Sequence, residues 1–285
     1  MAADIIQKTC VIGCIDRSPS AIAVCHASAW IAQTLNLPLT LLHMNEKIPT
    51  SAHHDLSGII GFDTRETLLN ELVDIEEKRA RLTREEGRQL LMSAKKITQD
   101  LGLLDVNTLQ RQGALAEMLN QEDAHIVVLG RRGEQSELTG HIGSQLEGII
   151  RLQKNSVLIC KRNFAPPKKI MIAFDGSGEG ERIIHRLTQV KLLADSDCYL
   201  VMYGNQDSKL KKAQNRLHQT GIKAKTCLLQ NGDNIVDELC RFAVQNNIDL
   251  IIMGAFGHSR LKQFFAGSHT TDMINKTPVS LLVIR

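Results

Sequence analysis

Glycine and serine residues suited to holding phosphate occur twice in the chain at one spacing. The spacing is Gly-x2-Gly-x9-Gly-Ser, and each copy directly follows an apolar run that is typical of a buried strand. The first copy consists of Gly130, Gly133, Gly143 and Ser144, and the second of Gly254, Gly257, Gly267 and Ser268. Glycine lets the main chain approach a ligand closely, and free N–H groups at a helix start favour an anion. Turn glycines and a capping serine would explain one copy, but the repetition favours two phosphate-binding loops.

An aspartate ends another apolar run in each half of the chain. Asp16 follows Cys-Val-Ile-Gly-Cys-Ile, and Asp175 follows Ile-Met-Ile-Ala-Phe. A carboxylate at the end of a buried strand could accept hydrogen bonds from ribose hydroxyls or from an adenine amino group. The same residue could instead cap the following helix or form an Asx turn. Both interpretations remain open at this point.

These matching blocks indicate an internal repeat with an insertion. The glycine blocks are 124 residues apart, from Gly130 to Gly254, whereas the aspartates are 159 apart, from Asp16 to Asp175. The first half therefore has about 35 additional residues. They fall in the charged segment 49–101, which predicts a long, mostly solvated helix after a loop, with a partner-binding helix as the alternative.

Apolar runs alternate with helical patterns throughout the second half. Strands are expected at 169–174, 198–203, 224–229, 249–253 and 279–284, and helices at 178–194, 208–220, 236–245 and 268–275. This alternation predicts an α/β fold with a parallel sheet, right-handed crossovers and helices on both faces. We expect a first domain at 1–162 with a helical insertion at about 50–101, a linker at 163–168 and a second domain at 169–285.

Composition and charge argue against several other classes of protein. A net charge of +3 and 4% aromatic residues do not favour a nucleic-acid binder. We find no apolar run long enough to span a membrane and no export signal. The seven cysteines are scattered and never spaced C-x-x-C, which predicts free thiols in a reducing cytoplasm and no metal site. No Gly-Lys pair occurs, so a Walker A loop is excluded.

With these motifs in view, the sequence resembles the universal stress protein family, as a tandem two-domain member. The resemblance rests on Asp16, on Asp175-Gly-Ser, on the doubled glycine loop and on the final run Pro278-Val-Ser-Leu-Leu-Val-Ile. It implies two Rossmann-like domains of the adenine nucleotide alpha hydrolase type. Each would have a five-stranded parallel sheet of order 3-2-1-4-5. It further implies that the domains pair through their last strands, and it admits a homodimer as well.

The resemblance also implies an adenine nucleotide as the ligand, either ATP or AMP/ADP, with Mg2+ as an accompanying ion. In the second half, Asp175 would hold the nucleoside, and Gly204 beside Tyr203 would line the adenine pocket. The phosphates would lie against Gly254, Gly257, Gly267, Ser268, His269 and Thr270. The corresponding residues of the first half are Asp16, Met44, Gly130, Gly133, Gly143, Ser144 and Gln145.

Some residues depart from the family pattern. Leu146 stands where the family favours Ser or Thr, and Arg17-Ser-Pro replaces Gly-Ser. Arg131 and Arg132 could pair with phosphates or fill the pocket. Because the second half keeps Thr270, we predict that it forms the better nucleotide site, although Tyr203-Gly204 replaces the usual His-Val.

Three functions compete. The first is a cytoplasmic stress-response protein that binds adenine nucleotide as a regulator and not as an enzyme, because no nucleophile–base set is evident. The second is a dimerisation or scaffold protein that works without nucleotide through the charged segment 66–101. The third is an enzyme that hydrolyses ATP or phosphorylates itself.

Overall fold

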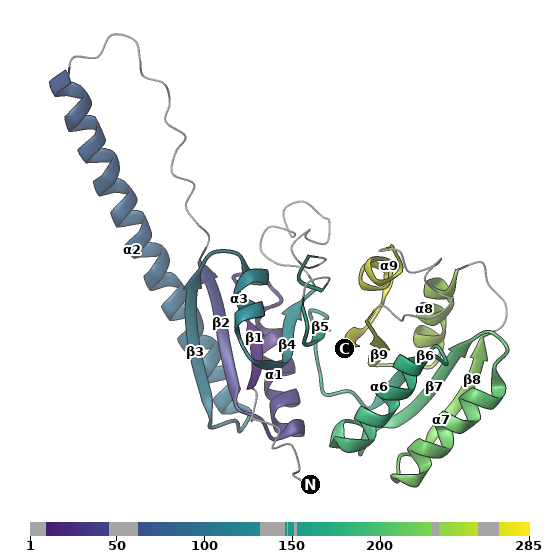
Figure 1. Ribbon diagram of the computed structural model, residues 1–285. Coiled ribbons are helices and arrows are strands. Elements are labelled where there is room, and N and C mark those ends of the chain that lie inside the picture. The colour runs from purple at the N-terminus through teal and green to yellow at the C-terminus, as the bar shows by residue number, and fades with distance from the viewer. Residues whose placement is uncertain are drawn as a thin grey trace, which may run out of the picture.

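The two halves of the chain form one continuous ten-stranded sheet (Figure 1). The computed structural model describes residues 10–45, 62–131, 146, 148–150, 153–229, 234–255 and 268–285, with the main chain alone at 62–70 and 268–271. The first half contributes β1 (Cys10–Cys14), β2 (Leu39–Asn45), β3 (Val106–Gln112), β4 (Ala124–Gly130) and β5 (Ser156–Cys160). The second half contributes β6 (Lys169–Phe174), β7 (Asp197–Tyr203), β8 (Ala224–Leu229), β9 (Leu250–Gly254) and β10 (Ser280–Ile284).

The strand order is β3-β2-β1-β4-β5-β10-β9-β6-β7-β8. Each half therefore has the order 3-2-1-4-5 that the family resemblance implies, and neighbouring strands within a half are parallel. The halves join through their last strands, β5 and β10, which run antiparallel with Leu158 opposite Leu282. The α/β fold class and the pairing of the last strands are confirmed.

Strand register shows which residues of the two halves are equivalent. Val11 pairs with Leu39 on one side, and Ile170 pairs with Cys198 in the same way. Through these registers Asp16 corresponds to Asp175, and Met44 to Tyr203. On the other side of β1 and β6, the register of β4 matches that of β9, so Gly130 corresponds to Gly254.

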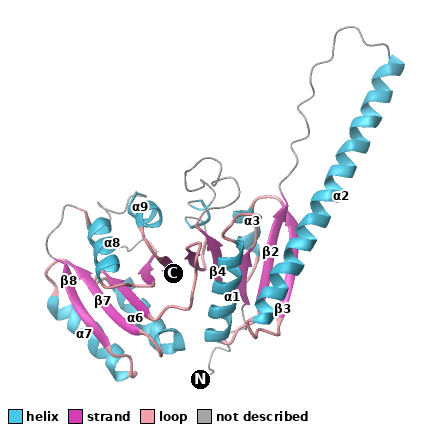
Figure 2. Cartoon of the chain, turned by 180° about the vertical axis from the view of Figure 1, so that it is seen from behind, coloured by secondary structure: helices cyan, strands magenta, loops and turns pink. Residues whose placement is uncertain are grey.

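Helices cover both faces of the sheet, as the front and back views show (Figures 1 and 2). One face carries α1 (Ala21–Leu35), α2 (Phe62–Asp100), α6 (Gly178–Gln189), the short 3-10 helix η1 (Lys191–Leu193) and α7 (Asp207–Gln219). The other face carries α3 (Leu115–Gln121), α8 (Ile235–Gln245) and α9 (Ser268–Lys276).

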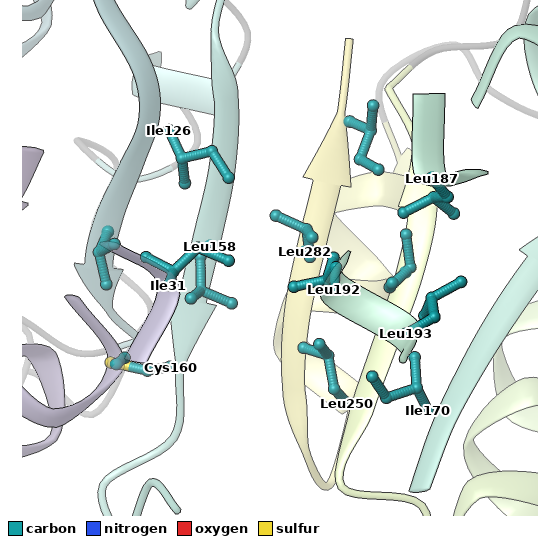
Figure 3. Close-up of a cluster of buried hydrophobic side chains, with 14 of the residues drawn as sticks. Ile31, Ile126, Leu158, Cys160, Ile170, Leu187, Leu192, Leu193, Leu250 and Leu282 are labelled. Atoms are coloured by element: carbon teal, nitrogen blue, oxygen red, sulfur yellow. The ribbon is translucent and has the colours of Figure 1, made fainter. Parts of the chain in front are cut away.

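Two apolar clusters fill the space between the sheet and its helices. Successive residues of a strand point to opposite faces, so Leu158 enters one cluster while Val157 and Ile159 enter the other. The first cluster continues across the junction of the halves, from Leu158 to Leu282 (Figure 3). The hydrophobic core therefore stabilises the pairing of the two half-sheets as well as each half.

Polar contacts also cross the junction. The main-chain N–H of Lys161, directly after β5, donates to the Ser280 hydroxyl at the start of β10, over 3.3 Å. At the far end of β10, the guanidinium of Arg285 donates to the Ile150 carbonyl. These bonds fix the ends of the paired strands.

Helix α2 lies within the charged segment of the first half and has 39 residues, about 58 Å at the usual helical rise. Its C-terminal part packs on β2, β3 and α1, and its N-terminal part extends beyond the sheet (Figure 1). Among the described residues, no helix combines the length and apolarity needed to cross a membrane.

Candidate functional site

The candidate site of the second half is built at the end of β6. β6 lies between β9 and β7, so the chain leaves it toward β7 and later returns on its other side. Ligands of open α/β sheets bind at such a switch point, beyond the carboxyl ends of the strands. The fold brings Asp175 after β6, Gly204 after β7 and Gly254 at the end of β9 to this one edge.

Asp175 forms a tight turn that starts helix α6. Its Oδ1 atom accepts hydrogen bonds from the Ser177 main-chain N–H, at 2.9 Å, and from the Ser177 hydroxyl, at 2.7 Å. The Ser177 hydroxyl in turn accepts from the N–H of Gly180, at 3.0 Å, and so caps the helix. The Asx-turn interpretation is therefore correct as far as Oδ1 is concerned. The described residues place no hydrogen bond on Oδ2, so that oxygen can still serve a ligand.

Two glycines let the main chain close around this turn. Gly176 has a φ of +69°, a conformation that residues with a side chain rarely adopt. A Cβ on Gly180 would lie 2.5 Å from the Asp175 Oδ1 atom, so the start of α6 can approach the carboxylate only without a side chain there.

Lys209 is a residue at this turn that sequence reasoning missed. It lies in the first turns of α7, and its ammonium donates to the Gly176 carbonyl over 3.0 Å. The bond holds the turn after Asp175 against the helix that follows β7. The sequence shows only that a basic residue follows the second strand of this half. It does not show that its ammonium would reach the main-chain carbonyl of Gly176.

The first half repeats the two hydrogen bonds to the aspartate but differs around them. The Asp16 Oδ1 atom accepts from the N–H of Ser18, at 3.0 Å, and from its hydroxyl, at 2.6 Å. Arg17 occupies the position of Gly176 and forms an ion pair with Glu86 of α2, at 3.0 Å. The turn is also held from β2, where the His43 ring nitrogen Nδ1 hydrogen-bonds the Ile15 carbonyl at 2.8 Å. In this half the turn is therefore tied to α2 through Arg17 and to β2 through His43.

The first glycine of each loop ends a strand next to the aspartate strand. After Gly130, the N–H of Arg131 donates to the Cys160 carbonyl over 3.1 Å. After Gly254, the N–H of Ala255 makes the equivalent bond to Ile284, over 2.9 Å. A Cβ on Gly254 would lie 2.7 Å from the Cδ1 atom of Ile183 in α6, so a larger residue there would require the Ile183 side chain to move.

Several predicted residues cannot be placed. Gly133, Gly143, Ser144 and Gln145 in the first half, and Gly257 and Gly267 in the second, lie outside the described residues, as does Arg132. The main chain at Ser268, His269 and Thr270 opens helix α9, which agrees with the predicted helix start after the second glycine loop. Met44 is the penultimate residue of β2 and is half-buried at the edge that Asp16 occupies.

Two departures from the family pattern have structural explanations. Leu146 is buried in the apolar cluster on the face of the sheet that carries α3. This position therefore contributes apolar packing and no hydroxyl. The side chain of Arg131 reaches the second half and donates to the carbonyls of Thr277 and Val279.

Thiol chemistry at the site is not favoured by the local pKa values. Burial, with a smaller contribution from the negative charge of Asp16, raises the pKa of the Cys14 thiol well above its usual range. This thiol stays protonated at neutral pH and is a poor nucleophile. Within the described part of the chain, no cluster of three or more His, Cys, Asp or Glu side chains could hold a metal ion.

Comparison with known proteins gives a consistent result. The family model described as "Universal stress protein family" matches residues 10–161 and 199–285. The universal stress protein Slr1230 of Synechocystis is 32% identical over 286 residues, covering 96% of this chain and 99% of that protein. The crystal structure of a universal stress protein from Archaeoglobus fulgidus superposes with a TM-score of 0.66 at 15% identity, covering 98% of this chain and 97% of that one. PA1789 of Pseudomonas aeruginosa superposes at 0.59, with 15% identity and coverages of 96% and 91%.

Proposed function

Since the chain belongs to the universal stress protein family, we propose that it binds an adenine nucleotide, ATP or AMP/ADP, at the edge formed by Asp175, Gly204 and Gly254. The nucleotide acts as a regulator in a cytoplasmic stress response, and the protein does not turn it over as an enzyme. The domains that carry this function are 1–162 and 169–285, joined by the linker 163–168.

The observation that carries the proposal is the repeated strand-end turn at the switch point of each half-sheet. Asp16 and Asp175 are held alike, each through Oδ1 and the serine two residues later. Both halves thus place a carboxylate in the same way at the strand end where open α/β sheets bind ligands. The Asp175 carboxylate, fixed through Oδ1, can present its Oδ2 atom to the ribose hydroxyls of a nucleoside without reorganising on binding.

Each remaining part of the nucleotide has residues assigned to it. Gly204, with a φ of +113°, lets the main chain pass the adenine closely. In the first half Met44, which corresponds to the neighbouring Tyr203, would line the adenine. The phosphates would meet the amides of Gly254, Gly257, Gly267, Ser268, His269 and Thr270, where the start of α9 favours negative charge. Gly130, Gly133, Gly143, Ser144 and Gln145 take the same role in the first half. When bound, Mg2+ would share the phosphate charge.

We propose that the second half binds more tightly. It has glycine at position 176, where the first half has Arg17 paired with Glu86. It also has Thr270 where the first half buries Leu146. The hydroxyl of threonine can donate to a phosphate oxygen, whereas leucine cannot.

The proposal is tested by calorimetric titration of the full chain with ATP, ADP and AMP. In Asp175→Asn the amide oxygen can keep the Ser177 bonds while the second carboxylate oxygen is lost, so binding should weaken with the fold intact. Asp195→Asn, at an exposed aspartate beside η1, is the matched control.

Gly257→Val should also abolish binding, because it places a branched side chain in the loop. If none of the nucleotides binds the wild type, the proposal is wrong.

A scaffold function keeps specific support from the exposed part of α2. That part carries large apolar side chains on its surface and has no role in the nucleotide site. The two functions can coexist in one chain, because they use different elements.

A further inference from the structure

Two arginines cross the junction of the halves, each reaching the main chain of the opposite half. Arg131 directly follows β4 in the first half, and its guanidinium donates to the carbonyls of Thr277 and Val279 in the second. Arg285 directly follows β10 in the second half, and its guanidinium donates to the Ile150 carbonyl in the first. The antiparallel pairing of β5 with β10 permits this exchange, because the end of each strand lies near the start of the other.

The arginines bind at equivalent helix ends. In the second half, the N–H of Thr277 donates to the Met273 carbonyl at the end of α9, over 2.9 Å. In the first half, the N–H of Gln153 makes the same bond to the Ile149 carbonyl, over 2.8 Å. The two bonds are 124 residues apart, from 153 to 277 and from 149 to 273, which is the spacing of the glycine loops. Carbonyls at a helix end have no further turn to bind them, and here the arginines take them.

The two helices concerned are those that follow the glycine loops. α9 begins at Ser268, the serine of the second loop. Residues 146 and 148–150 are helical and come shortly after Ser144, the serine of the first loop. The start of a helix favours an anion and its end favours a cation. In each half, therefore, the helix whose start is assigned to phosphate has its end held by an arginine of the other half.

Helix α9 is short, so a contact at its end also fixes its start. It has nine residues, about 14 Å at the usual helical rise. Within its own half, Lys276 of α9 forms an ion pair with Asp237 of α8 at 2.8 Å, but these side chains are 42% and 49% exposed, and exposed pairs contribute little. Arg131 is half-buried and bonds two carbonyls through a charged donor, so it restrains this end of α9 more strongly.

We propose, on the basis of the nucleotide site proposed above, that Arg131 is a positioning residue for the phosphates bound by the second half. It acts from the first half through α9, by holding the carbonyls after the helix while the main-chain amides at the helix start bind phosphate. Its positive charge at the end of the helix also complements the negative charge of the phosphates at the start. Arg285 has the reciprocal role for the helix of the first half, so each phosphate site is completed by a residue of the opposite half.

Calorimetric titration of the full chain with ATP and with adenosine tests the role of Arg131. Arg131→Met removes the guanidinium and should weaken ATP binding by about three- to thirtyfold. Adenosine has no phosphates to meet α9, so its affinity should stay at the wild-type value. Arg131→Lys keeps a charged donor and should recover part of the ATP affinity. Arg162→Ala, at an exposed arginine after β5, is the matched control and should change neither affinity.

Two site variants show which half each arginine serves. Asp16→Asn weakens the site of the first half, so the remaining binding reports on the second, and Asp175→Asn does the reverse. Arg131→Met should lower ATP affinity in the Asp16→Asn chain, and Arg285→Met should lower it in the Asp175→Asn chain. The two opposite combinations should bind ATP as their parent chains do, to within about twofold. Loss of stability alone would not produce this crossed pattern.

Three results would overturn the positioning role. They are unchanged ATP affinity on adding Arg131→Met to the Asp16→Asn chain, equal losses for ATP and adenosine, and a loss confined to the Asp175→Asn chain, where Arg131 would be serving its own half. Circular dichroism at the titration temperature checks folding, and if Arg131→Met does not fold, Arg285→Met in the Asp175→Asn chain decides. If adenosine or the first half binds too weakly to titrate, Arg131→Met against Arg162→Ala in the Asp16→Asn chain decides. A wild type that binds ATP without any of the expected effects refutes this role alone and leaves the proposed function standing.

Discussion

Arg131 in the first half of the chain donates a hydrogen bond of 3.0 Å from its guanidinium to the main-chain carbonyl of Val279 in the second. It also donates to the carbonyl of Thr277, just after helix α9. Arg131 directly follows Gly130, the first glycine of the first loop. One loop thus holds the connection between the last helix and the last strand of the other half.

Replacing this arginine should weaken the junction of the halves. Arg131→Ala leaves two main-chain carbonyls without the guanidinium, and we expect the free energy of unfolding to fall by about 1–3 kcal/mol. Urea denaturation measures the change. Arg162→Ala, at an exposed arginine after β5, should have little effect. Equal stabilities of the two variants would show that the bonds to Thr277 and Val279 contribute nothing.

Two glycines of α6 form a matched pair for testing the turn at Asp175. A Cβ at Gly180 would lie 2.5 Å from the Asp175 Oδ1 atom, whereas a Cβ at Gly178 would meet nothing within 4 Å. Gly180→Ala should therefore cost about 1–3 kcal/mol of stability and lower nucleotide affinity. Gly178→Ala should be neutral or stabilising by up to about 1 kcal/mol. Urea denaturation and calorimetry with ATP would detect both effects, and the reverse order would contradict the assigned geometry.

Leu146 distinguishes a packing position from a ligand position. Leu146→Thr removes buried apolar contacts and places a hydroxyl in the core, so we expect a loss of about 2–4 kcal/mol in the free energy of unfolding. Leu104→Thr is the control, because Leu104 is 85% exposed. A stable Leu146→Thr variant with a newly formed nucleotide site in the first half would show that the leucine, and not the surrounding packing, had closed that site.

Three buried cysteines predict a specific pH dependence. Burial raises the pKa of the thiols of Cys25, Cys160 and Cys198 to about 12 each. An unfolded thiol has a pKa of about 8.5, so folding favours the protonated form, and this stabilisation is complete below that value. It should be lost progressively as the pH rises from about 8.5 toward 12. Denaturation across this range should show the decline.

The same burial should protect these thiols from alkylation. At about pH 8 the folded chain should leave all three unmodified by iodoacetamide, and denatured chain should react at each, as peptide mass spectrometry can show. Rapid labelling of Cys160 in folded protein would contradict the assigned burial. Cys227, which is only half-buried, provides the comparison within the same molecule.

Local sequence patterns predicted the strands well because buried parallel strands are continuous apolar runs. The ranges 169–174 and 224–229 agree with β6 and β8 to the residue. The helix expected at 178–194 is instead α6, ending at Gln189, followed by η1. Val190 is extended between them, which turns Leu192 and Leu193 into the core. The apolar pattern continues through this break, so sequence periodicity could not reveal it.

Contacts between distant segments were beyond sequence reasoning. Gly87 would ordinarily weaken the middle of a helix, and its spacing says nothing of its neighbours. In the structure a Cβ there would lie 2.3 Å from the Gln110 amide nitrogen and 2.6 Å from the His43 ring, so glycine permits α2 to lie close to β2 and β3. The bonds of Arg131 are unpredictable for the same reason, because they depend on how two half-sheets meet.

The antiparallel junction of β5 with β10 has a consequence for the molecule in dilute solution. Strands that meet between separate subunits come apart as the protein becomes scarce, and subunits of different origin can then exchange. Here the two halves that carry these strands are covalently connected through residues 161–168, so dilution does not separate the strands into different subunits. The stoichiometry is permanently one to one, and each half is free to diverge in sequence without having to recognise any other copy of itself.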